Sequence, residues 1–129
     1  MKKIIFIAFA FVMLSICSVA ASAQVIRIHF ARGATSKVVT GRLSGYRSHR
    51  TYVIRVRSGQ TLTTESVKNY ITIGVKAPPG STYEQDMAAD CHDKNDVNPT
   101  AAGDYKIRVT ECRKADPWRG TFKFRVKVN

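Results

Sequence analysis

The sequence predicts an all-β protein, one domain built as a small antiparallel β-sandwich of about seven or eight strands. Apolar and polar residues alternate with a period of two in several short stretches, which is typical of half-buried strands. Turns rich in glycine and proline separate these stretches. After residue 23, no stretch shows the 3.6-residue period of an amphipathic helix. Together these observations favour two sheets packed around one core.

The first half of the domain supplies most of the expected strands. They cover residues 26–30, 38–43, 52–57, 61–67 and 70–75. Ile26, Ile28 and Phe30 alternate with polar residues in the first of them. Pro78 and Pro79 end the last of them, because proline lacks the N–H donor that a β-ladder requires.

The second half begins with a stretch that breaks the pattern. Residues 81–103 hold five of the nine acidic residues and few apolar ones, so they are expected to form a long loop with one short strand around Tyr83. Strict alternation returns over residues 104–112, and residues 113–120 form a second exposed connection. Residues 121–128 are the clearest strand, with Phe122 and Phe124 on one face.

Residues 1–23 carry the features of a secretory signal peptide. Lys2 and Lys3 precede an apolar run too short to span a membrane, and residues 21–23 form an A-x-A cleavage site. Cys17 raises the alternative of a lipoprotein, but Ile16 stands where a small residue is expected. We therefore expect a soluble mature domain of residues 24–129 in the periplasm, or secreted, with no membrane span.

The charge of the chain restricts its partners. The formal net charge is +12, and cleavage removes Lys2 and Lys3 but no acid, which leaves 19 − 9 = +10. Such an excess attracts anions of any kind. A nucleic-acid partner conflicts with the export signal, so the compartment favours an envelope polymer or a protein partner.

The two cysteines of the mature chain predict a disulfide. Cys91 and Cys112 form an even pair in an oxidising compartment. The bond would close a loop of about 20 residues, which the chain-entropy model values at roughly 3 kcal/mol. Cys91, His92 and Asp93 could instead donate to a metal, but no second cluster has ligand spacing, so we expect no metal and no cofactor.

The sequence lacks the groups that catalysis needs. His29, His49 and His92 are scattered, and no serine stands in a nucleophile-elbow sequence. The chain has no glycine-rich phosphate loop, and its clustered carboxylates lie in the solvated stretch at 84–96. No nucleophile, base and orienting group can be assembled, so we expect a protein that is not an enzyme.

The turn between the second and third strands is the clearest candidate for binding. Gly45 permits a sharp bend, and Tyr46 follows it at once, ahead of Arg47 and His49. Binding residues gather on turns that a rigid scaffold supports. Tyr46 is therefore either presented to a partner or packed on its own sheet.

Several expected strands direct basic residues outward. They are Arg27, Arg55, Arg57, Lys106, Arg108, Lys123, Arg125 and Lys127. One interpretation is a basic face for an anionic polymer. The other is an ordinary solvated sheet face whose charge gives solubility and protects strand edges.

The order and spacing of several segments resemble the periplasmic inhibitors of g-type (goose-type) lysozyme. The matching segments are residues 25–33, 40–46, 51–52, 57–60 and 101–109. The resemblance spans most of the mature chain and is weakest between residues 66 and 100. Related domains at the ends of secreted proteases share the Gly103-Asp104-Tyr105 strand, so that strand alone does not separate the two groups.

This resemblance implies a non-catalytic β-sandwich that inserts loops into the substrate cleft of g-type lysozyme. The family's inhibitory tyrosine, in a Gly-Tyr turn, corresponds to Tyr46 after Gly45. Its inhibitory arginine corresponds to Arg113, in an alignment that Pro117 and Trp118 disturb. On this hypothesis the rim of the inhibitory site consists of Ser44, Arg47, His49 and Arg119.

Alternatives from other classes stay open at the sequence level. The charge of +10 would slow the encounter with a basic lysozyme, unless the target is acidic or neutral or the acids at 84–96 approach it. A basic binding module for anionic envelope glycans or lipopolysaccharide would use the outward Arg and Lys side chains. A purely structural envelope domain would show neither activity.

Overall fold

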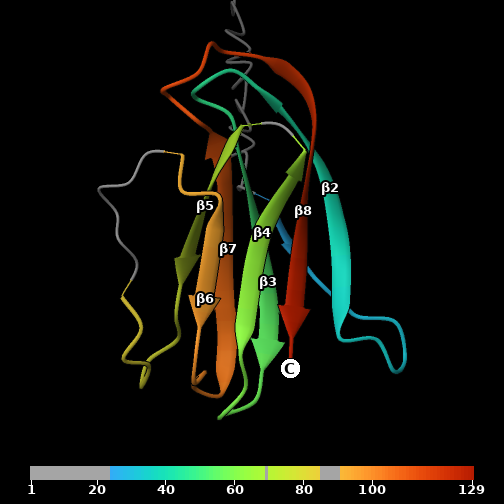
Figure 1. Ribbon diagram of the computed structural model, residues 1–129, viewed down its shortest axis with the longest axis vertical. Helices are drawn as coiled ribbons and strands as arrows, with labels where there is room; N and C mark the ends of the chain where they lie inside the picture. Colours follow the sequence, from blue (N-terminus) through green and yellow to red (C-terminus); the bar gives the residue numbers. More distant parts are fainter. Residues whose placement is uncertain (1–23, 69, 85–90) are drawn as a thin grey trace, which may run out of the picture.

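The computed structural model describes residues 24–68, 70–84 and 91–129, so the predicted signal peptide lies outside the described residues. Two four-stranded sheets pack face to face (Figure 1). The strands are β1 (Val25–Arg27), β2 (Ser36–Ser44), β3 (His49–Val56), β4 (Leu62–Lys68), β5 (Ile71–Lys76), β6 (Lys94–Val97), β7 (Gly103–Glu111) and β8 (Arg119–Val128). The predicted all-β sandwich is confirmed, with eight strands.

The strands cross between the sheets along the chain. One sheet has the order β1-β3-β7-β5 and the other β2-β8-β4-β6. All pairings are antiparallel except that of the short β1, which runs parallel to β3 with Val25 opposite Thr51. Consecutive strands β2 and β3 therefore belong to different sheets, and the turn that carries Tyr46 bridges the two layers.

The alternating residues of the long strands form the core between the sheets. Phe122, Phe124 and Val126 on β8 are fully buried, while Arg125 between them is exposed. The Tyr52 ring meets the Phe124 ring edge to face, with 5.3 Å between centroids. The period of two in the sequence thus translates directly into one inward and one outward face per strand.

The short strand expected around Tyr83 is the prediction that is wrong. Tyr83 lies outside any strand, and β6 (Lys94–Val97) pairs with β4 instead. The inward positions of β6 are Asn95 and Val97. Because one of them is polar, the strand lacks the apolar–polar alternation that would have predicted it. Asn95 tolerates burial because its amide donates to the Thr64 hydroxyl at 3.2 Å and to the Ile73 carbonyl at 2.9 Å.

The sandwich has two ends that matter for function. The tyrosine end comprises the turn of residues 45–48, the loop of residues 112–118 and Tyr70, at the top of Figure 1. The arginine end comprises residues 27–30, 34–35, 54–57, 60 and 128, around the lower end of β3. Strand β3 runs from one end to the other, a rise of about 23 Å at 3.3 Å per residue.

Residues 24–68, 70–84 and 91–129 contain neither a membrane-spanning helix nor a metal-binding cluster. None of these residues belongs to a helix long and apolar enough to cross a bilayer. In the same ranges, no three His, Cys, Asp or Glu side chains lie close enough to hold a metal ion.

Candidate functional site

The tyrosine end is built on a tight turn. Gly45 has φ of 90°, a left-handed conformation that costs glycine nothing and other residues about 1 kcal/mol or more. Its carbonyl accepts the Ser48 N–H at 3.1 Å, which closes the turn. Tyr46 is half-buried and Arg47 is exposed. The turn therefore fixes where the Tyr46 ring leaves the backbone.

A second loop, between β7 and β8, lies against this turn. The Tyr46 hydroxyl donates a hydrogen bond to the Ala115 carbonyl. The Gly45 N–H donates to the Trp118 carbonyl at 3.1 Å. Within the loop, the Ala115 N–H donates to the Cys112 carbonyl at 3.3 Å. The two connections predicted from the sequence to be exposed are thus bonded to each other.

Trp118 joins the two loops to the rest of the sandwich. Its backbone N–H donates to Oε1 of Glu111 at 2.7 Å, and its indole Nε1–H donates to the Tyr70 carbonyl at 3.4 Å. Since its carbonyl accepts from Gly45, Trp118 contacts the turn, strand β7 and Tyr70, the residue before β5. This network limits the freedom of Arg113, which lies in the same loop.

The disulfide fastens the base of the second loop. Cys91 and Cys112 are bonded, as the sequence predicted. The Cys112 N–H donates to the Tyr70 carbonyl at 3.1 Å, and the Cys91 N–H donates to the Thr72 hydroxyl at 2.9 Å. Arg113 follows Cys112 directly, so a covalent cross-link anchors the backbone immediately before it.

Tyr46 and Arg113 line one hollow of about 280 Å³. Arg47 and Ser48 line it beside Tyr46, and strand residues Thr72, Arg108, Thr110 and Glu111 form its remaining wall. The phenol and the guanidinium predicted to act together therefore lie at the same end of the molecule.

The other predicted site residues flank this hollow. Ser44 ends β2 directly opposite Arg119, the first residue of β8, and both are exposed. His49 begins β3 opposite Thr110 and is half-buried. Of the seven predicted positions, Gly45, Tyr46, Arg47 and Arg113 thus belong to the tyrosine end, and Ser44, His49 and Arg119 directly adjoin it.

Some residues of this end were not predicted from the sequence. Glu111 is only 2% exposed, and its Oε2 has no hydrogen-bond partner among the described residues. Tyr70 is 74% exposed, although the sequence pattern made it the first residue of a strand. The outward positions Arg108 and Thr110 follow from alternation in β7, so counting outward positions near the loop would have found them.

The basic residues that the sequence directs outward do not form a single face. Arg27, Arg55, Lys106 and Arg108 lie on the sheet that contains β3 and β7, with Arg57 one residue beyond β3. Lys123, Arg125 and Lys127 lie on β8, in the other sheet. The sandwich separates the two groups because its sheets turn their outer faces in opposite directions.

Comparison with known proteins gives the same fold in solved structures. No family model matches the chain, and no curated protein sequence matches it. Aeromonas hydrophila PliG, a periplasmic inhibitor of g-type lysozyme, superposes with a TM-score of 0.65 at 22% identity, over 82% of this chain and 96% of that one. Salmonella Typhimurium PliG gives 0.60 at 18% identity, over 84% and 100%.

The chain has the fold of the PliG inhibitors. A pre-peptidase C-terminal domain of a Bacillus anthracis collagenase shares the architecture less closely, with a TM-score of 0.50 at 16% identity over 84% of this chain and 97% of that one. The same sandwich therefore serves proteins with different tasks, as superfolds commonly do. The choice between these tasks rests on the residues at the tyrosine end.

Proposed function

We propose that this protein is a non-catalytic inhibitor of g-type lysozyme that blocks the substrate cleft with the loops of its tyrosine end. The observation that carries the proposal is that Tyr46 and Arg113 line one hollow on two loops bonded to each other. The shared fold with PliG supports the choice of partner.

Arg113 suits the cleft of a glycoside hydrolase. These enzymes use a carboxylic acid to protonate the leaving oxygen of the sugar. A guanidinium presents donors in a planar fork and can engage a carboxylate through two hydrogen bonds. Arg113 is exposed and forms no ion pair among the described residues, so its fork is available to a carboxylate of the partner.

Tyr46 has two tasks in this proposal. Its hydroxyl donates to Ala115 and so holds the loop of Arg113 in position. The exposed part of its ring covers apolar surface where a sugar ring would otherwise lie. Tyrosine and arginine are the usual anchors of tight interfaces, and loops fixed before binding lose less entropy on association. Tyr70, exposed on the same end, extends the contact surface.

The predicted signal peptide indicates in which compartment the protein acts. We infer that residues 1–23 are removed and that residues 24–129 act in the periplasm, where they meet a lysozyme that has crossed the outer membrane. Two of the acids that could relieve repulsion between basic partners lie at different levels of the sandwich. The Asp93 carbonyl accepts the Ser66 N–H near the end of β4, whereas Asp96 lies opposite Thr63, near the start of the same strand. A neutral or acidic lysozyme is therefore the better target.

The test is an inhibition assay against g-type, c-type and i-type lysozymes side by side. We expect inhibition of the g-type enzyme, and a loss of at least about tenfold, equivalent to 1.4 kcal/mol, for Tyr46→Ala and for Arg113→Ala. Tyr46→Phe should lose less, because it removes the bond to Ala115 and keeps the ring. Full inhibition by both alanine variants would contradict the site.

A matched control is Arg32→Ala, which removes the same charge from an exposed turn between β1 and β2. We expect it to inhibit like the unaltered protein. A loss equal to that of Arg113→Ala would mean that overall charge, and not cleft insertion, controls the interaction. Inhibition that persists in high salt would support insertion, since screening weakens contacts between exposed charges.

A further inference from the structure

The hollow beside Tyr46 has a wall that the proposed insertion of loops does not use. Its lining includes three arginines: Arg47 and Arg113 in the two bonded loops, and Arg108 on strand β7. Its volume of about 280 Å³ lies just below the range of roughly 300–1,000 Å³ that is usual for small-molecule sites. The hollow therefore suits a side chain of a partner protein better than a metabolite.

The strand wall of this hollow belongs to the outer face of one sheet. Along β7, the inward residues Ile107 and Val109 are fully buried. Arg108 and Thr110 alternate with them and therefore point to the outer face. Thr72 lies opposite Thr110 on strand β5 and so shares that face. Lining residues from two neighbouring strands thus face the same side of the sheet.

Hydrogen bonds and the disulfide hold the lining in place before a partner binds. The Thr72 hydroxyl accepts the Cys91 N–H at 2.9 Å, next to the disulfide with Cys112. The bond from Tyr46 to the Ala115 carbonyl holds together the two loops that contribute the rest of the lining. Because these contacts already exist in the free protein, little conformational entropy is lost when the hollow is occupied.

The hollow carries an excess of positive charge. Among the described residues, the guanidinium groups of Arg47, Arg108 and Arg113 have no hydrogen-bond or ion-pair partner. Glu111 also lines the hollow, but it occupies an inward position of β7 and its Oε1 accepts the Trp118 N–H. Three guanidinium groups and one carboxylate leave a local charge of 3 − 1 = +2. The group that fits is therefore an anion, and it would meet the outward guanidinium of Arg108 and not the inward carboxylate of Glu111.

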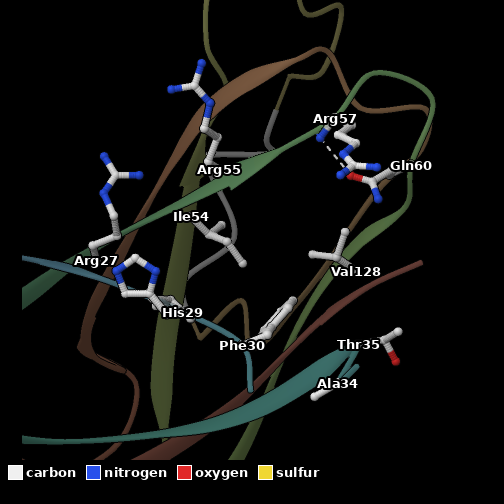
Figure 2. A pocket seen from close by; sticks show the side chains of 11 residues that line it. Arg27, His29, Phe30, Ala34, Thr35, Ile54, Arg55, Arg57, Gln60 and Val128 are labelled. Atoms are coloured by element: carbon white, nitrogen blue, oxygen red, sulfur yellow. Dashed lines mark hydrogen bonds between the residues drawn. The ribbon is translucent and has the colours of Figure 1, made fainter. Parts of the chain in front are cut away.

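The hollow at the arginine end does not gather its arginines in this way. It is larger, about 540 Å³, and Arg27, Arg55 and Arg57 line it. Figure 2 shows the Arg27 and Arg55 guanidinium groups directed away from Arg57. Arg27 is also bonded to Asp104 through two contacts of 3.1 Å. The arginines of that hollow cannot all bind one ligand, so the hollow beside Tyr46 is the stronger candidate for an anion site.

We propose that the hollow beside Tyr46 receives an acidic side chain of lysozyme from the lip of the substrate cleft, with Arg108 as its main ligand. This inference rests on the proposed function: while the loops enter the cleft, the outer face beside them would meet the lip. The carboxylate would accept two hydrogen bonds from the Arg108 guanidinium and one from the Thr110 hydroxyl. Arg47 would add attraction at the rim, and Arg113 would remain available to the carboxylate inside the cleft. An acid at this position would also reduce the repulsion that the net positive charge of the mature chain causes.

The first test measures inhibition of g-type lysozyme by variants of residues 24–129. Arg108→Gln should raise the inhibition constant at least about tenfold, and Arg108→Lys should recover part of the loss, because lysine keeps the charge but not the fork. Inhibition by Arg108→Gln should also depend less on salt than inhibition by the unaltered protein. The matched control is Arg55→Gln on the outer face of β3, four residues, or about 13 Å, beyond Thr51, which lies opposite Arg108. Equal losses for the two glutamine variants would overturn the proposal.

The second test needs no lysozyme. Residues 24–129, labelled with ¹⁵N, are titrated with N-acetylglutamate α-amide and followed by NMR, with N-acetylglutamine α-amide as the uncharged control and inorganic phosphate as a free anion. We expect saturable amide shifts at residues 46–48, 72 and 108–110 with the acid, no saturable shift with the uncharged control, and loss of the shifts in Arg108→Gln. Phosphate binding tenfold tighter than the acid, or shifts that persist in Arg108→Gln, would overturn the proposal.

Together the two tests separate this inference from the proposed function. Full inhibition by Arg108→Gln would overturn the inference and leave the proposed function standing. Binding of the glutamate probe through Arg108 by a protein that inhibits no lysozyme would overturn the proposed function, and with it the assignment of the acid to lysozyme.

Discussion

The two ends of the sandwich are both fixed, but different contacts fix them. At the tyrosine end, two loops are bonded to each other through Tyr46, Ala115, Gly45 and Trp118, and a disulfide anchors their base. At the arginine end, Thr100 holds one turn, because its hydroxyl donates to the Arg57 carbonyl and accepts the Gln60 N–H. Three arginines line the hollow at each end, so the ends differ in how their loops are held and not in the number of arginines.

The difference separates two ways in which a scaffold can prepare a surface for binding. Shape complementarity requires loops that keep their conformation, since ordering them on binding reduces affinity. Attraction of an anion requires only that cationic groups project from a stable edge, because electrostatic interactions are long-ranged and tolerant of small displacements. If the two ends are independent, each can be perturbed without the other.

Removal of the disulfide should have the largest effect on stability and should act mainly at the tyrosine end. Cys91→Ser with Cys112→Ser is expected to lower the free energy of unfolding by about 2–4 kcal/mol, measured by urea denaturation. Hydrogen exchange should show greater loss of protection at residues 70–72 and 113–118 than at residues 57–60. Uniform loss of protection would contradict the idea that the ends are stabilised separately.

Gly41→Ala should destabilise the middle of the sandwich and so affect both ends alike. A Cβ at Gly41 would overlap the Phe122 ring and the Tyr52 hydroxyl, and both belong to buried side chains. We expect a loss of about 1–3 kcal/mol in thermal or urea unfolding, since a packed core resists added volume. Thr40→Ala, at the exposed neighbouring position, is the control and should change stability little.

Glu111 gives a smaller and more local test. Glu111→Ala removes the acceptor of the Trp118 N–H but also removes a buried carboxylate, so we expect a net loss of about 1 kcal/mol. Glu111→Gln keeps an oxygen for that bond and should preserve stability. Fluorescence of the single tryptophan should shift in the alanine variant alone. Identical spectra for both variants would show that Glu111 does not position the loop.

The smallest effect concerns the Arg27–Asp104 pair at the arginine end. The hydrogen bond from Arg27 lowers the pKa of Asp104 below its ordinary value of 3.8. A carboxyl with a depressed pKa stabilises the folded state above its unfolded pKa, and this contribution disappears as pH falls through the folded pKa. The thermal unfolding midpoint of Asp104→Asn should therefore lie slightly below that of the unaltered protein at pH 6.

The gap between these midpoints should close as the pH falls below about 4 and Asp104 becomes protonated in the folded state as well as in the unfolded state. The pair is exposed, with side-chain exposures of 46% and 40%, so solvent screening keeps the effect small. A gap that widened in acid would contradict the assigned sign.

Much of the candidate site was predictable because turn chemistry is local. Gly45 before Tyr46 marks a bend in any context, and the φ of 90° at Gly45 agrees with that expectation. The strict alternation of β8 likewise identifies its inward residues without reference to any other strand. By contrast, β6 was not predicted, because Asn95 occupies one of its inward positions. Hydropathy does not show that this amide can be buried through hydrogen bonds to Thr64 and Ile73.

The fold class, most strand positions and the pairing of Cys91 with Cys112 could be predicted from the sequence, since alternation is a local pattern and two cysteines allow one pairing. Three features could be found only in the folded chain: Tyr46 bonds to the loop of Arg113, Glu111 bonds to Trp118 in that loop, and the basic residues divide between two outer faces. These facts depend on which strands share a sheet, and strand order follows from packing between distant segments that no local pattern encodes.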